Sequence, residues 1–255
     1  MNRISLFCLP AILLASIFIS SCTGNQQHKS MIKLGTTVVI MVEKDSITMG
    51  ADSRTQVYTS PDNFHFSDTT NKIFKAGNFF CAFAGTESLG DQPLKDIVIK
   101  NYDPTKKLED NCDVLSQKLT VTAQEYYSLL SPEQKNLFNG KDMGRYQINL
   151  DIAGYEKNKP LVGIVVVNIK KQGDNYIAVP DEPMIRNMTY QIVSAGFDDH
   201  LRQLLLQNAY HASYSTSKDV PKLISFEAKY HPEVDSNVNY VVIKKQSFRL
   251  GNNYK

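Results

Sequence analysis

Apolar and polar positions alternate in blocks whose lengths suit short strands and medium-length helices. Residues 37–42 (TVVIMV) are a continuous apolar run, residues 43–46 (EKDS) have the composition of a turn, and residues 47–51 (ITMGA) resume the apolar pattern. Two short apolar runs on either side of a polar turn are typical of a β-hairpin. We therefore expect ordered structure from Leu34 onward, beginning with this hairpin.

The register of the expected hairpin places one acidic residue next to its first strand. If residues 44–45 form a two-residue loop, positions whose numbers add up to 89 face each other. Thr37 then lies opposite Asp52, and Thr36 lies opposite Ser53. The sequence thus predicts that Asp52 lies beside the start of the first strand.

The rest of the chain predicts further strands and two pairs of helices. Residues 55–71 are polar and are expected to be a connection, and residues 72–84 resemble a second hairpin that turns at Gly77 and ends at Gly85. Helical spacing and a proline at a first turn indicate helices. The expected helices are 93–101, 107–130, 198–210 and 218–230, and the other expected strands are 146–153, 161–169, 175–179, 188–194 and 238–244.

The order of these elements indicates the fold class. Strands, two helices, strands, two helices and a final strand follow one another without a fixed-period repeat or a low-complexity linker. This order lacks regular βαβ spacing and favours antiparallel sheets with helices outside them. We expect an α+β protein with one domain over residues 36–255, built as a four-layer αββα sandwich of two stacked antiparallel sheets flanked by helices.

Composition and charge exclude several classes of protein. The 255 residues are 42% hydrophobic and 21% charged, as in soluble globular proteins rather than disordered or polytopic membrane proteins. Residues 1–35 hold three basic residues and no acidic one, so 25 basic and 26 acidic residues remain after them. This balance gives no indication of nucleic-acid binding.

The amino terminus has the pattern of an export signal. Arg3 precedes an apolar stretch over residues 4–19, and a Ser-Ser-Cys sequence ends at Cys22. This junction resembles the bacterial lipobox, which implies a signal peptide over 1–21, lipid on Cys22 and a tether or propeptide over 22–35. An ordinary secretory signal and an uncleaved anchor are the alternatives. All three place the domain outside the cytoplasm. The lipobox resemblance implies a location in a bacterial cell envelope, lipid-anchored on the extracytoplasmic side of a membrane, or periplasmic if released.

The cysteines and histidines give no indication of a metal or cofactor site. Cys81 lies in an apolar run and Cys112 in an expected helix, so both are expected to be core residues, and a disulfide between them is left open. The histidines are scattered and lack a metal-binding motif, so surface or capping roles are expected. They are His28, His65, His200, His211 and His231.

Four short motifs occur in order within about fifty residues. They are GTTVV at 35–39, GADSR at 50–54, NKIF at 71–74 and FAG at 83–85. Together they resemble the amino-terminal half of proteasome β subunits and their bacterial peptidase relatives, which are amino-terminal-nucleophile (Ntn) hydrolases.

The resemblance implies a role for each matched residue. It implies that Thr36 is the nucleophile, that Asp52 and Lys72 complete the catalytic group, and that the backbone N–H of Gly85 stabilises the oxyanion. Lys72 comes about four residues later than in the family, which fits a longer loop at 58–66. Cleavage of the bond after Gly35 would expose Thr36.

The chemistry of this group can also be argued from the residues alone. A threonine hydroxyl is a weak nucleophile that needs a base, and a free α-amine with a pKa of about 7.7 to 8.0 is a suitable one. A neighbouring Lys72 ammonium would raise the neutral fraction of that amine, and Asp52 would hold the lysine.

The carboxy-terminal half resembles the family less closely. Ser194-Ala195-Gly196 stands where the family has GSG, so Ala195 occupies the serine position and Ser194 would serve only after a shift of one residue. The remaining candidate supporting residues are Arg54, Glu233, Asp235 and Ser236, with Glu233 and Asp235 equally plausible as the acid. The polar segment 131–145 is expected to be a surface insertion or to alter the packing of a ring.

Three functions remain open at this point. The first is a threonine peptidase that exposes Thr36 by self-cleavage and hydrolyses peptides or unfolded chains, without a cofactor. The second is a catalytically silent lipoprotein that uses the fold as a scaffold, and the third is a small-molecule amide hydrolase. Members of the family assemble as stacked rings, and whether this chain forms a homo-oligomeric ring is left open. Because ATP is absent outside the cytoplasm, an ATP-driven unfoldase partner is not expected.

Overall fold

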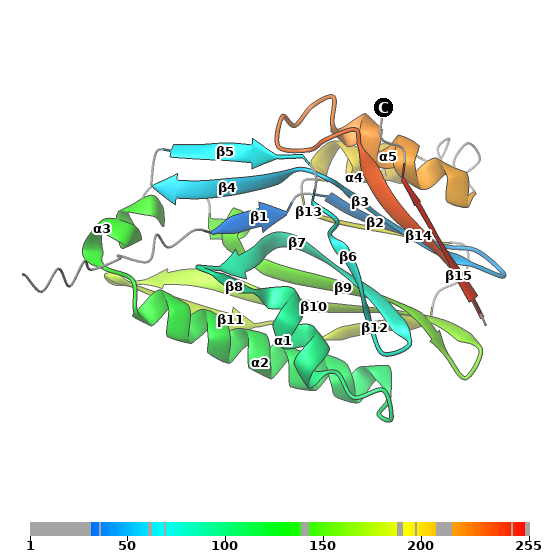
Figure 1. The fold of residues 1–255 in the computed structure, drawn as a ribbon, viewed down its shortest axis with the longest axis horizontal. Coiled ribbons are helices and arrows are strands. Elements are labelled where there is room, and N and C mark those ends of the chain that lie inside the picture. The colour runs from blue at the N-terminus through cyan, green and yellow to red at the C-terminus, as the bar shows by residue number, and fades with distance from the viewer. Residues whose placement is uncertain are drawn as a thin grey trace, which may run out of the picture.

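The structure is a computed structural model of a mixed α/β protein with two antiparallel sheets (Figure 1). It describes residues 32–35, 37–60, 63–68, 70–138, 143–187, 191–196, 198–207, 216–245 and 247–252. The signal peptide, Cys22, Thr36, His28 and His211 lie outside the described residues.

The larger sheet has the order β11-β10-β9-β7-β1-β4-β5, with β12 paired to β10 and both β6 and β8 paired to β7. Its strands are β1 (Lys33–Gly35), β4 (Thr55–Ser60), β5 (Asn63–Ser67), β6 (Ile73–Ala76), β7 (Phe79–Leu89), β8 (Gln92–Pro93), β9 (Ile148–Glu156), β10 (Lys159–Gln172), β11 (Asn175–Pro180) and β12 (Met184–Asn187). The short strand β1 is an interior strand of this sheet, paired with β4 on one side and β7 on the other.

The smaller sheet has the order β13-β2-β3-β14-β15. Its strands are β2 (Thr37–Val42), β3 (Ile47–Asp52), β13 (Gln191–Gly196), β14 (Val238–Lys244) and β15 (Ser247–Asn252). Because β1 belongs to the larger sheet and β2 to the smaller one, the chain passes from one sheet to the other at residue 36.

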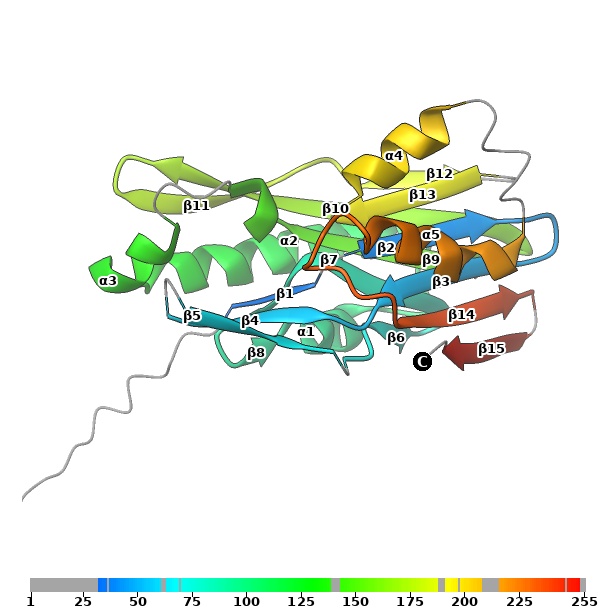
Figure 2. The same ribbon diagram turned by 90° about the horizontal axis from the view of Figure 1, so that it is seen from above.

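Helices cover the outer face of each sheet (Figure 2). The helices are α1 (Leu94–Asn101), α2 (Leu108–Ser128), α3 (Pro132–Lys135), α4 (Asp199–Leu206) and α5 (Val220–Glu227), with 3₁₀ turns at Asn136–Phe138, Met143–Tyr146 and Ser217–Asp219. Helices α1 and α2 pack on the larger sheet, and α5 packs on β2 and β3 of the smaller one.

Three apolar clusters hold these elements together. The first includes Leu115 and Leu119 of α2 and Ile152 of β9. The second contains Ile40 of the smaller sheet and Ala82 of the larger one, so it lies between the sheets. The third joins the smaller sheet to α4 and α5. Burial on both faces explains why the strands near the centre have continuous apolar runs.

The structure confirms the two antiparallel sheets and the register of the first hairpin. Val38 pairs with Ala51 and Val42 pairs with Ile47, and both pairs add up to 89. The long helix over 107–130 is confirmed as α2, and the last predicted strand has the bounds of β14. A two-residue loop leaves little freedom of register, which is why this prediction succeeded.

The predicted polar connection over 55–71 is wrong, because it contains the strands β4 and β5. In β5, Phe64 and Phe66 alternate with polar residues, which is a strand pattern, but both rings are exposed and the short alternation lies in a polar segment. Strand β7 continues past Gly85 to Leu89, and β1, β8, β12 and β15 were not predicted.

Other expectations hold over part of their range. The last four residues of the expected tether over 22–35 are built into the protein, since β1 pairs on both sides and Ile32 is fully buried. The expected helix 198–210 is α4 up to Leu206, and residues 208–210 lie outside the described residues. The segment 131–145 contains α3 and two 3₁₀ turns, with 139–142 likewise not described.

Candidate functional site

A buried carboxylate at the end of β3 forms the centre of the candidate site. Asp52 is fully buried, and its Oδ1 accepts hydrogen bonds from the backbone N–H of Thr37 at 2.9 Å and from Lys72 Nζ at 3.1 Å. Its Oδ2 accepts from the backbone N–H of Arg54 at 3.0 Å and of Asp235 at 3.4 Å. Four donors therefore compensate the cost of burying this charge.

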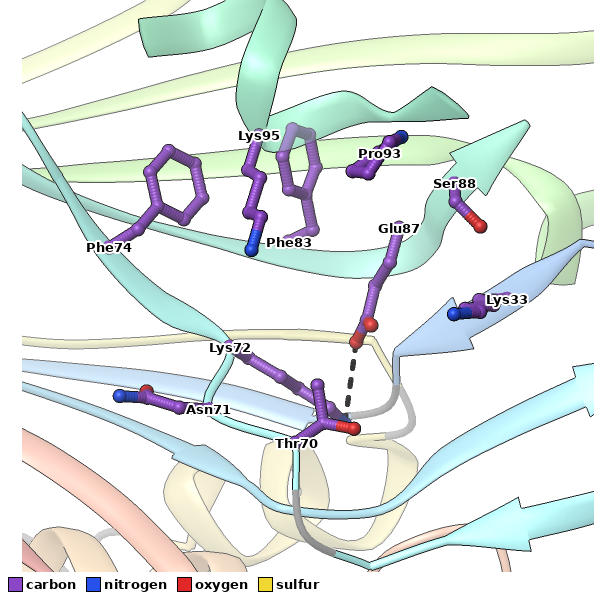
Figure 3. Close-up of a pocket in the computed structure, with 10 residues that line it drawn as sticks. All are labelled: Lys33, Thr70, Asn71, Lys72, Phe74, Phe83, Glu87, Ser88, Pro93 and Lys95. Carbon is purple, nitrogen blue, oxygen red and sulfur yellow. Dashed lines mark ion pairs between the residues drawn. The ribbon is translucent and has the colours of Figure 1, made fainter. Parts of the chain in front are cut away.

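Lys72 precedes β6 and turns its ammonium into the same site. Its side chain is 1% exposed and forms an ion pair with Asp52. Nζ also donates to the backbone carbonyl of Arg54 and lies 3.6 Å from Glu87 Oε1. Figure 3 marks this ion pair between Lys72 and Glu87 with a dashed line. A buried lysine needs charge partners, and Asp52 and Glu87 provide them for the Lys72 ammonium.

Glu87 of β7 is the site residue that the sequence analysis missed. Its Oε2 accepts from Thr55 Oγ1 at 3.2 Å, and burial raises the pKa of this carboxyl while the Lys72 charge opposes the shift. The Glu87 side chain also fills the space that a Cβ at Gly35 would need. A lone acidic residue after a long apolar run was the one signal for it in the sequence.

Both covalent neighbours of Thr36 belong to this group of residues. Gly35 lies against the Glu87 carboxylate, and the N–H of Thr37 is bound by Asp52. Thr36 itself lies outside the described residues. Asp52 and Lys72, the two partners that the sequence predicted for Thr36, are therefore brought together beside the residues that flank it.

The turn after β3 is held by the segment that precedes β14. Ser53 Oγ has two acceptors for its one proton, the carbonyl oxygen of Asp68 at 2.6 Å and Asp235 Oδ2 at 2.9 Å, and the Ser53 N–H donates to the carbonyl of Asn237. Asp235 in turn accepts from the backbone N–H and the side-chain amide of Asn237 at 3.1 and 2.8 Å. Of the two acids that the sequence offered, Asp235 is bonded to this turn, whereas Glu233 is half-buried and Ser236 is exposed.

Arg54 braces this turn from outside. Its guanidinium forms two hydrogen bonds with the Asp68 carboxylate, at 2.7 and 2.9 Å, and its Nη1 donates to the carbonyl of Pro232 at 2.6 Å. The hydrogen bonds from Arg54 hold the pKa of Asp68 below its usual value. Arg54 therefore has a positioning role here.

Strand β13 lies next to β2 and brings Gly196 opposite Thr37. Ala195 lies opposite Val38 and is buried in the cluster between the sheets, and Ser194 lies opposite Val39. Because side chains alternate along a strand, Ser194 and Ala195 point to opposite faces.

Gly85 lies where β7 pairs with β1, opposite Gly35. Its φ is +81°, and a Cβ at this position would collide with the carbonyl oxygen of Gln147. Only glycine adopts this conformation next to another backbone at low cost.

A cavity of about 160 Å³ opens beside Lys72 and Glu87. Figure 3 shows the rings of Phe74 and Phe83 on one side of it and Thr70 and Asn71 on the other. The residues that line it are Lys33, Thr70, Asn71, Lys72, Phe74, Phe83, Glu87, Ser88, Pro93 and Lys95.

The two described cysteines belong to the core rather than to this site. Cys81 and Cys112 are both buried and free. Burial raises the pKa of the Cys112 thiol to about 12 and that of Cys81 well above its usual value. Neither thiol therefore has the thiolate character that a reactive cysteine needs.

Comparison of the sequence with protein-family models and with curated proteins gives no match. Among the helices of the described residues, none is both long and apolar enough to cross a membrane.

Proposed function

We propose that the protein is a threonine peptidase of the Ntn-hydrolase class, with the four-layer αββα fold of that class. The observation that carries the proposal is the buried pair of Asp52 and Lys72, which is bonded to the N–H of the residue next to Thr36. A structural role alone needs no buried lysine at this position, because an apolar residue pair of similar volume is often equally stable.

The proposed reaction uses the amine of a newly exposed Thr36 as its base. The amine takes the proton of the Thr36 hydroxyl, the hydroxyl oxygen attacks the substrate carbonyl, and the proton passes to the leaving amine. The Lys72 ammonium favours the neutral amine, and the Gly85 N–H receives the oxyanion. Water then hydrolyses the acyl-enzyme by the reverse proton path and restores the free threonine.

Strand β1 supports the proposal that the protein cleaves itself after Gly35. Cleavage would separate β1 from β2, and only non-covalent contacts would then hold β1, namely its pairing with β4 and β7 and the burial of Ile32 and Leu34. If β1 then left the sheet, a gap one strand wide would remain between β4 and β7. An extended peptide can fill such a gap by β-augmentation, so the proposed substrates are peptides or unfolded segments rather than folded proteins. The cavity lined by Phe74 and Phe83 would receive one of their side chains.

The scaffold function is the second candidate, and two observations favour it. Ala195 occupies the position at which the related peptidases have a serine, and it is buried among apolar residues. In addition, cleavage after Gly35 would separate the domain from any lipid on Cys22. A scaffold would keep β1 in place and keep its anchor.

Labelling with a mechanism-based inhibitor separates the two functions. We expect a peptide epoxyketone, which reacts with both the hydroxyl and the amine of an amino-terminal threonine, to add once to the processed chain. Peptide mapping should locate the adduct on Thr36. Thr36→Ala is the control and should remain unlabelled. A wild-type chain that stays unlabelled at saturating inhibitor favours the scaffold.

Substitution of Gly35 tests the tight packing before the cleaved bond. We expect Gly35→Ala to slow self-cleavage about 10-fold or more. The added Cβ would collide with the Glu87 side chain and displace the bond between residues 35 and 36 from its reactive position. Glu87→Ala should restore part of the rate in the double variant, since the obstructing atoms are then absent. The measurement is the time course of cleaved chain by intact mass. Equal rates for wild type and Gly35→Ala would contradict this account.

A further inference from the structure

Two histidines and a glutamate meet outside the candidate catalytic site, where α4 contacts the end of α5. His200 is the second residue of α4, Glu227 is the last residue of α5, and His231 follows one helical turn later. One nitrogen of each imidazole and one oxygen of the carboxylate all lie within 4.8 Å of one another. Figure 2 shows α4 and α5 side by side over the smaller sheet.

The distances in this cluster suit a metal ion better than they suit two strong hydrogen bonds. Glu227 Oε1 lies 3.3 Å from His200 Nδ1 and 3.2 Å from His231 Nε2. Ligand bonds of about 2.1 Å to a tetrahedral Zn²⁺ place neighbouring ligand atoms about 3.4 Å apart. Hydrogen bonds between a charged imidazole and a carboxylate are usually shorter, at about 2.7–2.9 Å.

The Glu227 carboxylate is held so that Oε1 faces both histidines. Glu227 is fully buried, and its Oε2 accepts from the N–H of Leu201 at 2.6 Å. The ring of His200 stacks on Tyr230, with ring centroids 4.1 Å apart and an interplanar angle of 9°. Oε1 also accepts from the backbone N–H of His200 at 3.3 Å, so both oxygens cap α4. Capping of backbone groups does not account for the two imidazoles that converge on Oε1. Such orientation by outer contacts is typical of metal ligands.

The two histidine side chains reach solvent, whereas His231 Nε2 and the Glu227 carboxylate are themselves buried. The side chains of His200 and His231 are 39% and 18% exposed. Three protein ligands leave one position of a tetrahedron to water. We propose that His200, Glu227 and His231 bind one Zn²⁺ ion.

The proposed ion would also brace the candidate catalytic site. The chain that follows His231 offers the carbonyl of Pro232 to Arg54, and the N–H of Asp235 to Asp52. Fixing His231 therefore fixes one end of the segment that holds the turn after β3. The ion does not touch the reacting atoms, so the proposal does not depend on the peptidase function.

Titration with Co²⁺ tests the proposal, because Co²⁺ replaces Zn²⁺ in such sites and absorbs visible light when its coordination is tetrahedral. The protein from Thr23 to Lys255 is freed of metal with a chelator and titrated with Co²⁺, and Zn²⁺ is then added. We expect one equivalent of Co²⁺ to bind and one equivalent of Zn²⁺ to displace it. His231→Gln and His200→Gln should each weaken Co²⁺ binding about 100-fold or more, because loss of an outer-shell partner alone costs about 10- to 100-fold and these variants remove a ligand itself.

His65→Gln is the matched control, because His65 lies on the exposed strand β5 and should leave the affinity unchanged. Circular dichroism of the variants shows whether they fold. The proposal is overturned if Co²⁺ binds without a stoichiometric end point. It is equally overturned if folded His200→Gln and His231→Gln bind as tightly as His65→Gln.

Discussion

Replacement of Lys72 by methionine is expected to abolish self-cleavage and to lower peptide turnover by about 10³-fold or more. The ammonium of Lys72 is the charge that keeps the Thr36 amine neutral in the proposed mechanism. Its loss also leaves Asp52 as a buried carboxylate without its cation, which costs about 3–5 kcal/mol of unfolding free energy. Turnover of a fluorogenic peptide and urea denaturation measure the two effects.

A double variant separates the catalytic effect from the effect on stability. Asp52→Asn combined with Lys72→Met removes both charges, so the double variant should recover much of the lost stability while it remains inactive. Lys75→Met is the control, because Lys75 is exposed on the neighbouring strand β6. Cleavage of the Lys72→Met chain at the wild-type rate would remove Lys72 from the mechanism.

Replacement of Asp151 by asparagine is expected to stabilise the protein at pH 8 but not at pH 4. Asp151 lies on β9, is 1% exposed, and neither of its carboxylate oxygens has a partner among the described residues. Burial, together with the nearby Asp198 charge, raises the pKa of Asp151 from 3.8 to about 7. The folded state therefore holds a proton that the unfolded state has already released between these two pH values.

The sign of the pH dependence follows from this difference. Well below pH 3.8 both states are protonated and the pH-dependent cost of Asp151 vanishes, whereas stability falls as the pH rises and the full cost is present above pH 7. A shift from 3.8 to about 7 corresponds to about 4 kcal/mol, and Asp151→Asn should gain up to this amount at pH 8.

Urea denaturation at pH 4, 6 and 8 measures this effect, with every chain carrying Thr36→Ala so that a single form is compared. Asp113→Asn on the exposed face of α2 is the control, and its difference from the parent should not change in the same way. A gain for Asp151→Asn that is the same at all three pH values would contradict a raised pKa.

The sequence predicted the parts of the site that depend on local geometry. A two-residue loop determines the pairing of β2 with β3, so the position of Asp52 beside Thr37 followed from counting residues. Lys72 was found by its motif. Its bond to the carbonyl of Arg54 depends on the path of β4, which a polar sequence concealed.

Contacts between distant segments could not be predicted in this way. Glu87 reaches Gly35 because β7 pairs with β1, and no local pattern shows that β1 enters the sheet. The histidine cluster is a second case, since His200 meets Glu227 and His231 only after two helices pack together. Spacing rules detect metal ligands that lie within one element. Here one of the three proposed ligands, His200, lies on α4, whereas the other two lie at the end of α5 and just after it.

The intact mass and the amino-terminal sequence of the chain from Thr23 to Lys255 test the central claim most directly. Thr36→Ala, made in the same way, is the comparison. The proposed mechanism predicts that the wild-type chain begins at Thr36 while the variant remains uncut. Two uncut chains would contradict it, because no free threonine amine would then form, and a variant that is cut at the same bond would show that another protease makes the cut.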